Sequence, residues 1–82
     1  PLKRTQSGYT DTYTNSAGCK LIDYRNRIID ICELYGEPVI DLYSISGVNS
    51  ITIPTLAPDG LHLNGAGYDF VTPIAAKQVN VI

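Results

Sequence analysis

The apolar residues between positions 17 and 35 recur with the period of an α-helix. They stand at i, i+3, i+7, i+10 and i+14, which draws a single stripe along one side of a helix. The stripe consists of Leu21, Tyr24, Ile28, Ile31 and Tyr35. Gly36 stands where a left-handed residue would end this helix, and Pro38 just beyond it prevents continuation. We therefore predict a helix over residues 17–35, capped at its start by Asn15 or Ser16.

Residues 38–43 form a short and nearly continuous apolar run directly after this helix. Such a run between turn residues is typical of a buried strand in a parallel sheet. A β-hairpin is the alternative, because residues 43–53 alternate apolar and polar side chains around a Gly-Val-Asn sequence. Pro54 would then keep the second strand at a sheet edge. We favour a strand followed by a loop, because Asp41 and Ser44 stand where the chain commonly changes direction after a strand.

The two ends of the chain differ in character. Residues 5–16 contain no aliphatic side chain and are rich in groups that hydrogen-bond their own backbone, which predicts a loop. Tyr9 and Tyr13 in this loop are candidates for stacking against a sugar, although loop tyrosines more often simply face solvent. At the other end, residues 65–80 predict a second helix with Asn64 as its N-cap. Its expected apolar face consists of Tyr68, Val71, Ile74 or Ala75, and Val79, with Pro73 bending or restarting the helix.

The composition excludes several classes of partner. The chain has 82 residues, enough for one domain at most, and no apolar run approaches the ~20 residues that a membrane span requires. Its 44% hydrophobic and 17% charged residues are typical of a globular protein. The net charge of −2, with only six Lys and Arg residues, argues against a nucleic-acid partner.

The single histidine, His62, makes residues 58–68 the stretch where chemistry is most plausible. An imidazole exchanges protons near neutral pH, and a carboxylate that accepts its Nδ1 proton leaves Nε2 free to face a nucleophile. Asp59 lies three residues earlier, and Gly60 allows the backbone to bring both side chains together. We take Asp59 and His62 as the candidate catalytic residues. They are too few for a metal site, so we expect no metal and no cofactor.

The string Asp-Gly-Leu-His-Leu-Asn at residues 59–64, followed by Gly67, Tyr68 and an apolar helix, resembles the last conserved block of SGNH or GDSL-type esterases and acylhydrolases. The helix with Tyr24, Arg25, Ile28 and Ile29 and the run at 39–43 agree with this resemblance. It implies an α/β fold, in which this chain is the C-terminal helix-strand-loop-helix piece of a three-layer α/β/α, flavodoxin-like sheet. It also implies that Asp59 and His62 are the acid and base of a Ser-His-Asp triad. Leu63 replaces the proline that is common in the family.

The Gly-Asp-Ser block that carries the nucleophile in that family does not occur here, nor do the blocks that supply its oxyanion-hole glycine and asparagine. Ser44, Ser46 and Ser50 stand in a different context, and none of them receives the nucleophile role. We therefore expect residues 1–82 to be the C-terminal part of a single SGNH hydrolase-like domain, inactive alone. A missing N-terminal portion or another chain would cover its apolar faces.

The substrate expected from the resemblance is an ester or an acylated carbohydrate, for example one that carries O-acetyl groups. A hypothesis from another class is a non-catalytic α/β structural or adhesion module. In such a module Asp59 and His62 would form a structural turn and carry out no chemistry.

Overall fold

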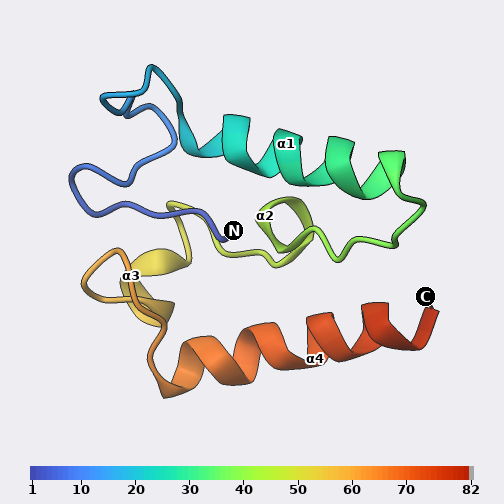
Figure 1. Cartoon of the computed structure of the whole chain (residues 1–82). Helices are drawn as coiled ribbons and strands as arrows, with labels where there is room; N and C mark the ends of the chain where they lie inside the picture. Colours follow the sequence, from blue (N-terminus) through green and yellow to red (C-terminus); the bar gives the residue numbers. More distant parts are fainter. Residues whose placement is uncertain (82) are drawn as a thin grey trace.

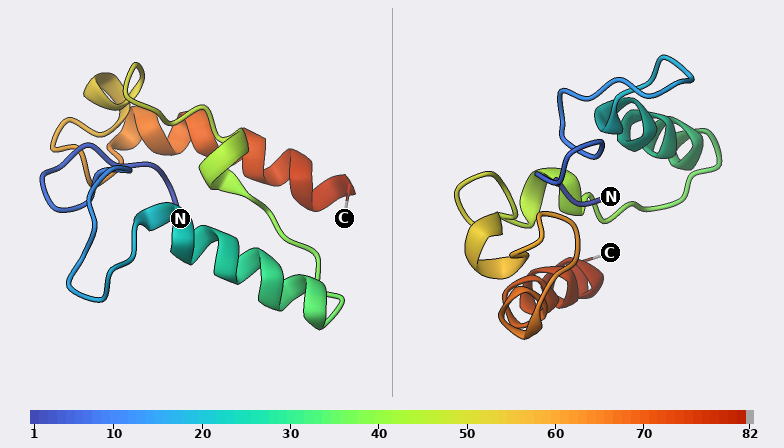
Figure 2. Two further views of the ribbon diagram at one scale, coloured as in Figure 1. Left: turned by 90° about the horizontal axis from the view of Figure 1, so that it is seen from above. Right: turned by 90° about the vertical axis from the view of Figure 1, so that its left-hand side faces the viewer.

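The computed structural model describes residues 1–81, which form four α-helices joined by irregular segments (Figure 1). The helices are α1 (Leu21–Leu34), α2 (Leu42–Ile45), α3 (Ile53–Leu56) and α4 (Gly65–Val81). The two long helices, α1 and α4, lie on opposite sides of the molecule, with the N-terminal residues and α2 between them (Figure 2). The molecule is flat, with extents of 36 × 34 × 15 Å.

The predicted α/β sheet is wrong, because none of the residues 1–81 forms a β-strand. Residues 38–41 of the expected strand run as irregular chain, and from Leu42 the backbone coils into α2. The alternative hairpin over residues 43–53 is also wrong, because its second half enters α3 at Ile53. A strand is held by hydrogen bonds to a neighbouring strand, and no other described segment pairs with these residues. Apolar composition alone therefore did not produce a strand or a flavodoxin-like layer.

The first predicted helix is confirmed, but α1 starts later than expected, at Leu21. Its N-cap is Lys20, whose backbone amide donates to a carboxylate oxygen of Asp23 at 2.7 Å. The expected caps are therefore wrong. Asn15 instead closes the preceding loop, where its side-chain oxygen accepts two backbone amides.

The expected end of this helix is confirmed at Gly36, which adopts a left-handed φ of +67°. The Gly36 amide donates to the Glu33 carbonyl at 3.2 Å, and the next amide, of Glu37, donates to the Cys32 carbonyl at 2.8 Å. These two bonds form the Schellman arrangement that satisfies the last carbonyls of a helix. Glycine at this position therefore ends α1 without strain.

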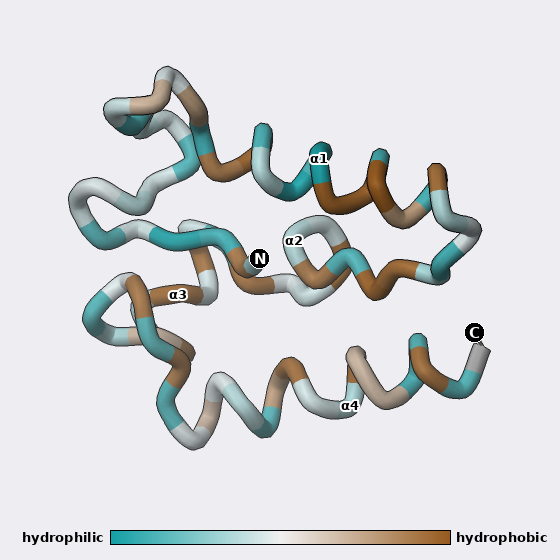
Figure 3. The backbone as a smooth tube through the Cα atoms, in the orientation of Figure 1, coloured by the Kyte–Doolittle hydropathy of each residue, from teal (hydrophilic) through white to brown (hydrophobic). Residues whose placement is uncertain are grey.

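Most of the apolar stripe of α1 stays exposed in the described chain. Tyr24, Ile28 and Ile31 remain 47%, 48% and 41% exposed, and no residue of α1 is fully buried. The side chains of α1 that are half-buried lie mainly on a neighbouring face and include Ile22, Arg25, Ile29 and Cys32. Apolar residues along both long helices are visible in Figure 3. The helix was predicted correctly from its stripe, yet residues 1–81 cover that stripe only in part.

The buried core is small and lies around α3 and the first half of α4. It consists of Val48, Ile53, Leu56, Ala57 and Val71, with Leu2, Leu42 and Leu63 packed against it. The predicted second helix is confirmed as α4, which continues through Pro73. Its expected apolar face is only partly buried, because Tyr68 and Val79 are each 61% exposed. The core therefore anchors one long helix of the two.

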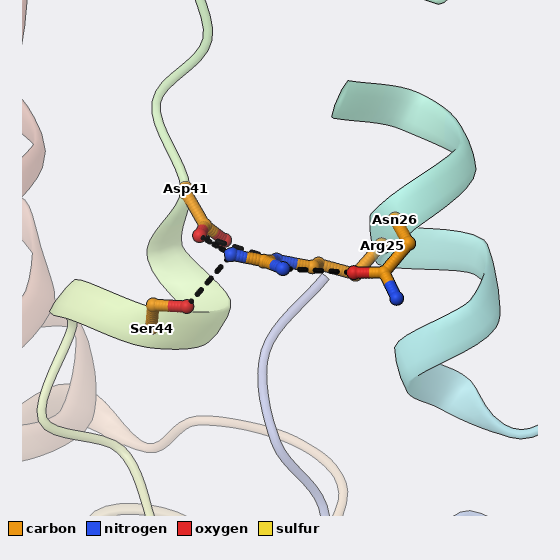
Figure 4. Close-up of polar contacts among 4 residues, drawn as sticks. All are labelled: Arg25, Asn26, Asp41 and Ser44. Atoms are coloured by element: carbon orange, nitrogen blue, oxygen red, sulfur yellow. Dashed lines mark hydrogen bonds and ion pairs between the residues drawn. The ribbon is translucent and has the colours of Figure 1, made fainter. Parts of the chain in front are cut away.

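An ion pair connects α1 to the segment that enters α2 (Figure 4). The Nε and Nη2 atoms of Arg25 donate to one carboxylate oxygen of Asp41 at 3.2 Å and 2.5 Å, and Nη2 also donates to the Ser44 hydroxyl at 3.1 Å. The hydrogen bond from Arg25 is the largest cause that lowers the pKa of Asp41 below its ordinary value. Because α1 buries no side chain fully, this pair is its most specific attachment to the rest of the chain.

We expect the Arg25→Ala substitution to loosen α1, because it removes the guanidinium that binds both Asp41 and Ser44. Amide hydrogen exchange across α1 should become several-fold faster, while exchange in α4 stays unchanged. Arg27→Ala is the matched control, since Arg27 lies exposed on the same helix. Equal exchange rates in the two variants would contradict a tethering role for the ion pair.

Candidate active site

A tight turn between α3 and α4 carries both candidate catalytic residues. Gly60, at its centre, adopts a φ of +76°, a left-handed conformation that residues with a side chain rarely adopt. The Gly60 amide donates to the Ala57 carbonyl at 2.8 Å, which closes the turn directly after α3. The turn brings the side chains of Asp59 and His62 into contact.

The two side chains form a hydrogen-bonded pair at the surface. The Nδ1 atom of His62 lies 2.8 Å from Oδ2 of Asp59. The other carboxylate oxygen, Oδ1, accepts the backbone amides of Leu61 at 2.8 Å and His62 at 2.7 Å. The His62 side chain is 76% exposed and that of Asp59 is 47% exposed. Asp59 is therefore held by three hydrogen-bond donors, while most of the imidazole faces outward.

These donors stabilise the ionised form of Asp59. They lower the pKa of Asp59 from 3.8 to about 2, with the His62 amide as the largest cause, then the His62 side chain and the Leu61 amide. Asp59 is thus ionised at neutral pH and only accepts hydrogen bonds. In the neutral imidazole of His62, the proton then lies on Nδ1 and the lone pair on Nε2. Such a pair can take a proton at Nε2 and stabilise the imidazolium that results.

The N-terminal segment holds the turn from the other end of the chain. The backbone amides of Thr5 and Gln6 both donate to the Gly60 carbonyl, at 2.9 Å and 3.1 Å. The Arg4 side chain donates to the Leu61 carbonyl at 2.8 Å, across 57 positions of sequence. We did not predict these contacts, because nothing in the composition of residues 4–6 indicates a partner so far along the chain.

Asn64 joins the end of the turn to the start of α4, and its predicted N-cap role is confirmed. Its side-chain oxygen accepts the amide of Gly67 at 2.8 Å, and its amide nitrogen donates to the Thr55 carbonyl in α3 at 2.9 Å. Gly67 permits this junction to be close, since a Cβ atom there would collide with the Leu56 carbonyl oxygen. One residue therefore caps α4 and ties it to α3 beside the candidate pair.

In the described part of the chain, Asp59 is the only residue that hydrogen-bonds the His62 side chain. Two of the serines considered above have structural contacts instead. The Ser44 hydroxyl accepts a hydrogen bond from Arg25, and fully buried Ser46 accepts the backbone amide of Val48 at 3.1 Å. Neither lies within hydrogen-bond distance of His62, so residues 1–81 place no nucleophile beside this candidate base.

Comparison of the chain with protein families, with curated proteins and with solved structures found no match. Across residues 1–81, the helices are too short or too polar to cross a bilayer. Nor does this range bring together three or more His, Cys, Asp or Glu side chains that could hold a metal ion. The features of the chain that bear on its function are therefore the geometry of the Asp59–His62 pair and the motif at residues 59–64.

We expect Gly60→Ala to release the N-terminal segment from the turn. The added Cβ atom would lie 2.6 Å from both the Gln6 amide nitrogen and the Thr5 hydroxyl oxygen, and the left-handed φ would cost roughly 1–3 kcal/mol. The amides of Thr5 and Gln6 should lose their protection from hydrogen exchange. Gly65→Ala is the matched control, because a Cβ atom there meets nothing within 4 Å. Unchanged protection in Gly60→Ala would contradict this account of the turn.

We also expect the turn to lose stability only in strong acid. Because the pKa of Asp59 is lowered to about 2, its stabilising contribution is fully present above about pH 4 and is lost between about pH 4 and pH 2. Following the Asp59 carboxyl ¹³C shift by NMR should give a midpoint near 2. In His62→Ala the two backbone donors remain, so the midpoint should rise only part of the way. A midpoint at 3.8 in the unsubstituted chain would refute the assignment.

Proposed function

We propose that this chain supplies the general base and the orienting carboxylate of a serine esterase or acylhydrolase. The observation that carries the proposal is the 2.8 Å contact between Asp59 Oδ2 and His62 Nδ1, with an imidazole that is otherwise exposed. In this role Asp59 holds the imidazole in the tautomer that leaves Nε2 free. Nε2 takes the proton of a serine hydroxyl as the oxygen attacks an ester carbonyl, and returns it to the leaving alcohol.

The serine in this proposal belongs to a polypeptide segment other than these 82 residues, either an N-terminal portion of the same protein or another chain. Two observations support an external segment. The outer side of His62 is open, so a second surface has room to approach it. The stripe on α1 and the residues Tyr68 and Val79 on α4 also leave apolar side chains exposed, as expected for faces that another segment covers.

The substrate class follows from the resemblance of residues 59–64 to the SGNH block. It is an ester of a small acyl group, and we favour an acylated carbohydrate as the alcohol component. Hydrolysis of such an ester requires a base, a nucleophile and oxyanion donors, of which this chain contributes the base and its orienting partner. The remaining groups come with the external segment.

A fluorophosphonate probe tests the proposal, because it bonds covalently to serines that are activated by a neighbouring base. The probe should not label the 82 residues alone. It should label a serine outside them in the natural protein or complex that contains this chain. His62→Ala should abolish this labelling, and Asp59→Asn should slow it, since an amide at that position favours the wrong imidazole tautomer. Asp69→Asn is the matched control, because Asp69 is exposed on α4.

The outcomes separate the parts of the proposal. Labelling of the isolated 82 residues that depends on His62 would show that the nucleophile lies within them. Absence of any His62-dependent labelling in the natural protein would refute the esterase assignment.

The second candidate function is a non-catalytic module in which Asp59 and His62 only stabilise a turn. One observation favours it: Oδ1 of Asp59 already accepts two backbone amides, which is sufficient to hold a turn without chemistry. In that case the His62→Ala substitution would change neither the binding of partner proteins nor the fluorophosphonate labelling of the natural protein. The labelling experiment distinguishes the two candidates directly.

A further inference from the structure

A pocket of about 420 Å³ opens between the N-terminal loop, the first turn of α1 and the turn that carries His62. This volume falls within the range of ligand-binding pockets. Three tyrosines line it, Tyr9 and Tyr13 from the loop and Tyr24 from α1. Arg4 and Leu61 line the same pocket and are hydrogen-bonded to each other. Leu61 lies between Asp59 and His62 in the sequence, within the turn that carries this pair.

The lining combines flat aromatic rings with polar groups. Tyr9, Tyr13 and Tyr24 are 54%, 46% and 47% exposed, so part of each ring is available to a ligand. The Tyr24 hydroxyl accepts a hydrogen bond from the Asn15 side chain at 2.8 Å, which holds the Tyr24 ring at the first turn of α1. The Nη1 atom of Arg4 donates a hydrogen bond to the Leu61 carbonyl, and the other N–H groups of its guanidinium can donate to a ligand. The pocket therefore offers apolar faces together with hydrogen-bonding groups.

This combination favours a sugar over a fatty acyl chain. A pyranose ring presents C–H groups on its faces and hydroxyl groups around its edge, which match tyrosine rings and polar donors respectively. A long acyl chain would instead require aliphatic walls, and Leu21 and Leu61 are the only aliphatic side chains in the lining. The pocket has no carboxylate in its lining, so it presents no negative charge that would repel the carbonyl oxygen of an acetyl group.

We infer that the tyrosine pocket, defined by Tyr9, Tyr13 and Tyr24, binds a sugar ring of the acylated carbohydrate whose ester lies at His62. The inference rests on the proposed function for the position of the ester, but binding of the sugar requires no catalysis. Leu61 connects the two sites, because it lines the pocket and is followed in sequence by His62, the proposed base. The tyrosines therefore position the alcohol component and leave proton transfer to His62.

NMR titration of the ¹⁵N-labelled 82-residue chain tests the inference with two probes, partially acetylated xylotetraose and partially acetylated cellotetraose. At least one probe should shift the signals of Tyr9, Tyr13 and Tyr24 saturably and give NOEs from sugar ring protons to the tyrosine ring protons. Tyr9→Ala and Tyr13→Ala should each bind about tenfold more weakly, the loss of one stacking contact. Tyr35→Ala is the matched control, because Tyr35 is 73% exposed at the far end of α1.

Two further variants separate this inference from the proposed function. Tyr24→Phe keeps the ring and should retain binding. His62→Ala should bind the probe as the unsubstituted chain does, even where it abolishes labelling by the fluorophosphonate. Sugar binding without His62-dependent labelling would support the pocket and refute the esterase.

The inference itself is overturned if neither probe shifts the tyrosine signals, or if hexanoate competes for the same signals more strongly than either sugar. The NOEs are measured on the unsubstituted chain, so they remain decisive if a tyrosine variant fails to fold.

Discussion

The carbonyl oxygen of Gly60 is the point on which the arrangement of the site depends. It accepts two backbone amides from residues 5 and 6, so the beginning of the chain is docked on the turn between α3 and α4. The left-handed backbone of Gly60 is what exposes this carbonyl, and the absence of a Cβ atom is what lets the N-terminal segment approach. Together with the hydrogen bond from Arg4 to the Leu61 carbonyl, this contact fixes the start of the loop that carries Tyr9 and Tyr13 beside the turn of His62.

The parts of the structure that were predictable from sequence are those determined by near neighbours. Gly36 ends α1 and Asn64 begins α4 through hydrogen bonds that span three to five residues. The contact between Asp59 and His62 is equally local, because three positions and one glycine are sufficient to form it. The spacing of the two residues was therefore sufficient to predict that their side chains meet. Their chemical role stays a prediction.

The errors concern features that depend on distant partners. The run at residues 38–43 has the composition of a buried strand, but a strand requires a second strand beside it, and the described chain supplies none. The stripe on α1 likewise reveals that a helix forms but not what covers it, and here Ile28 and Ile31 remain exposed. The pairing of Arg25 with Asp41 was not visible in the sequence, since charged residues on a helix usually face water.

The candidate base, His62, is oriented by the same short turn that carries it. Because the Asp59–His62 pair is complete within four residues, its geometry is set by local hydrogen bonds alone. In the proposed esterase, an approaching serine would meet an imidazole that is already oriented, so the external segment would only have to position the serine. We propose that it does so by covering the apolar side chains that α1 and α4 leave exposed, while the tyrosine pocket holds the substrate.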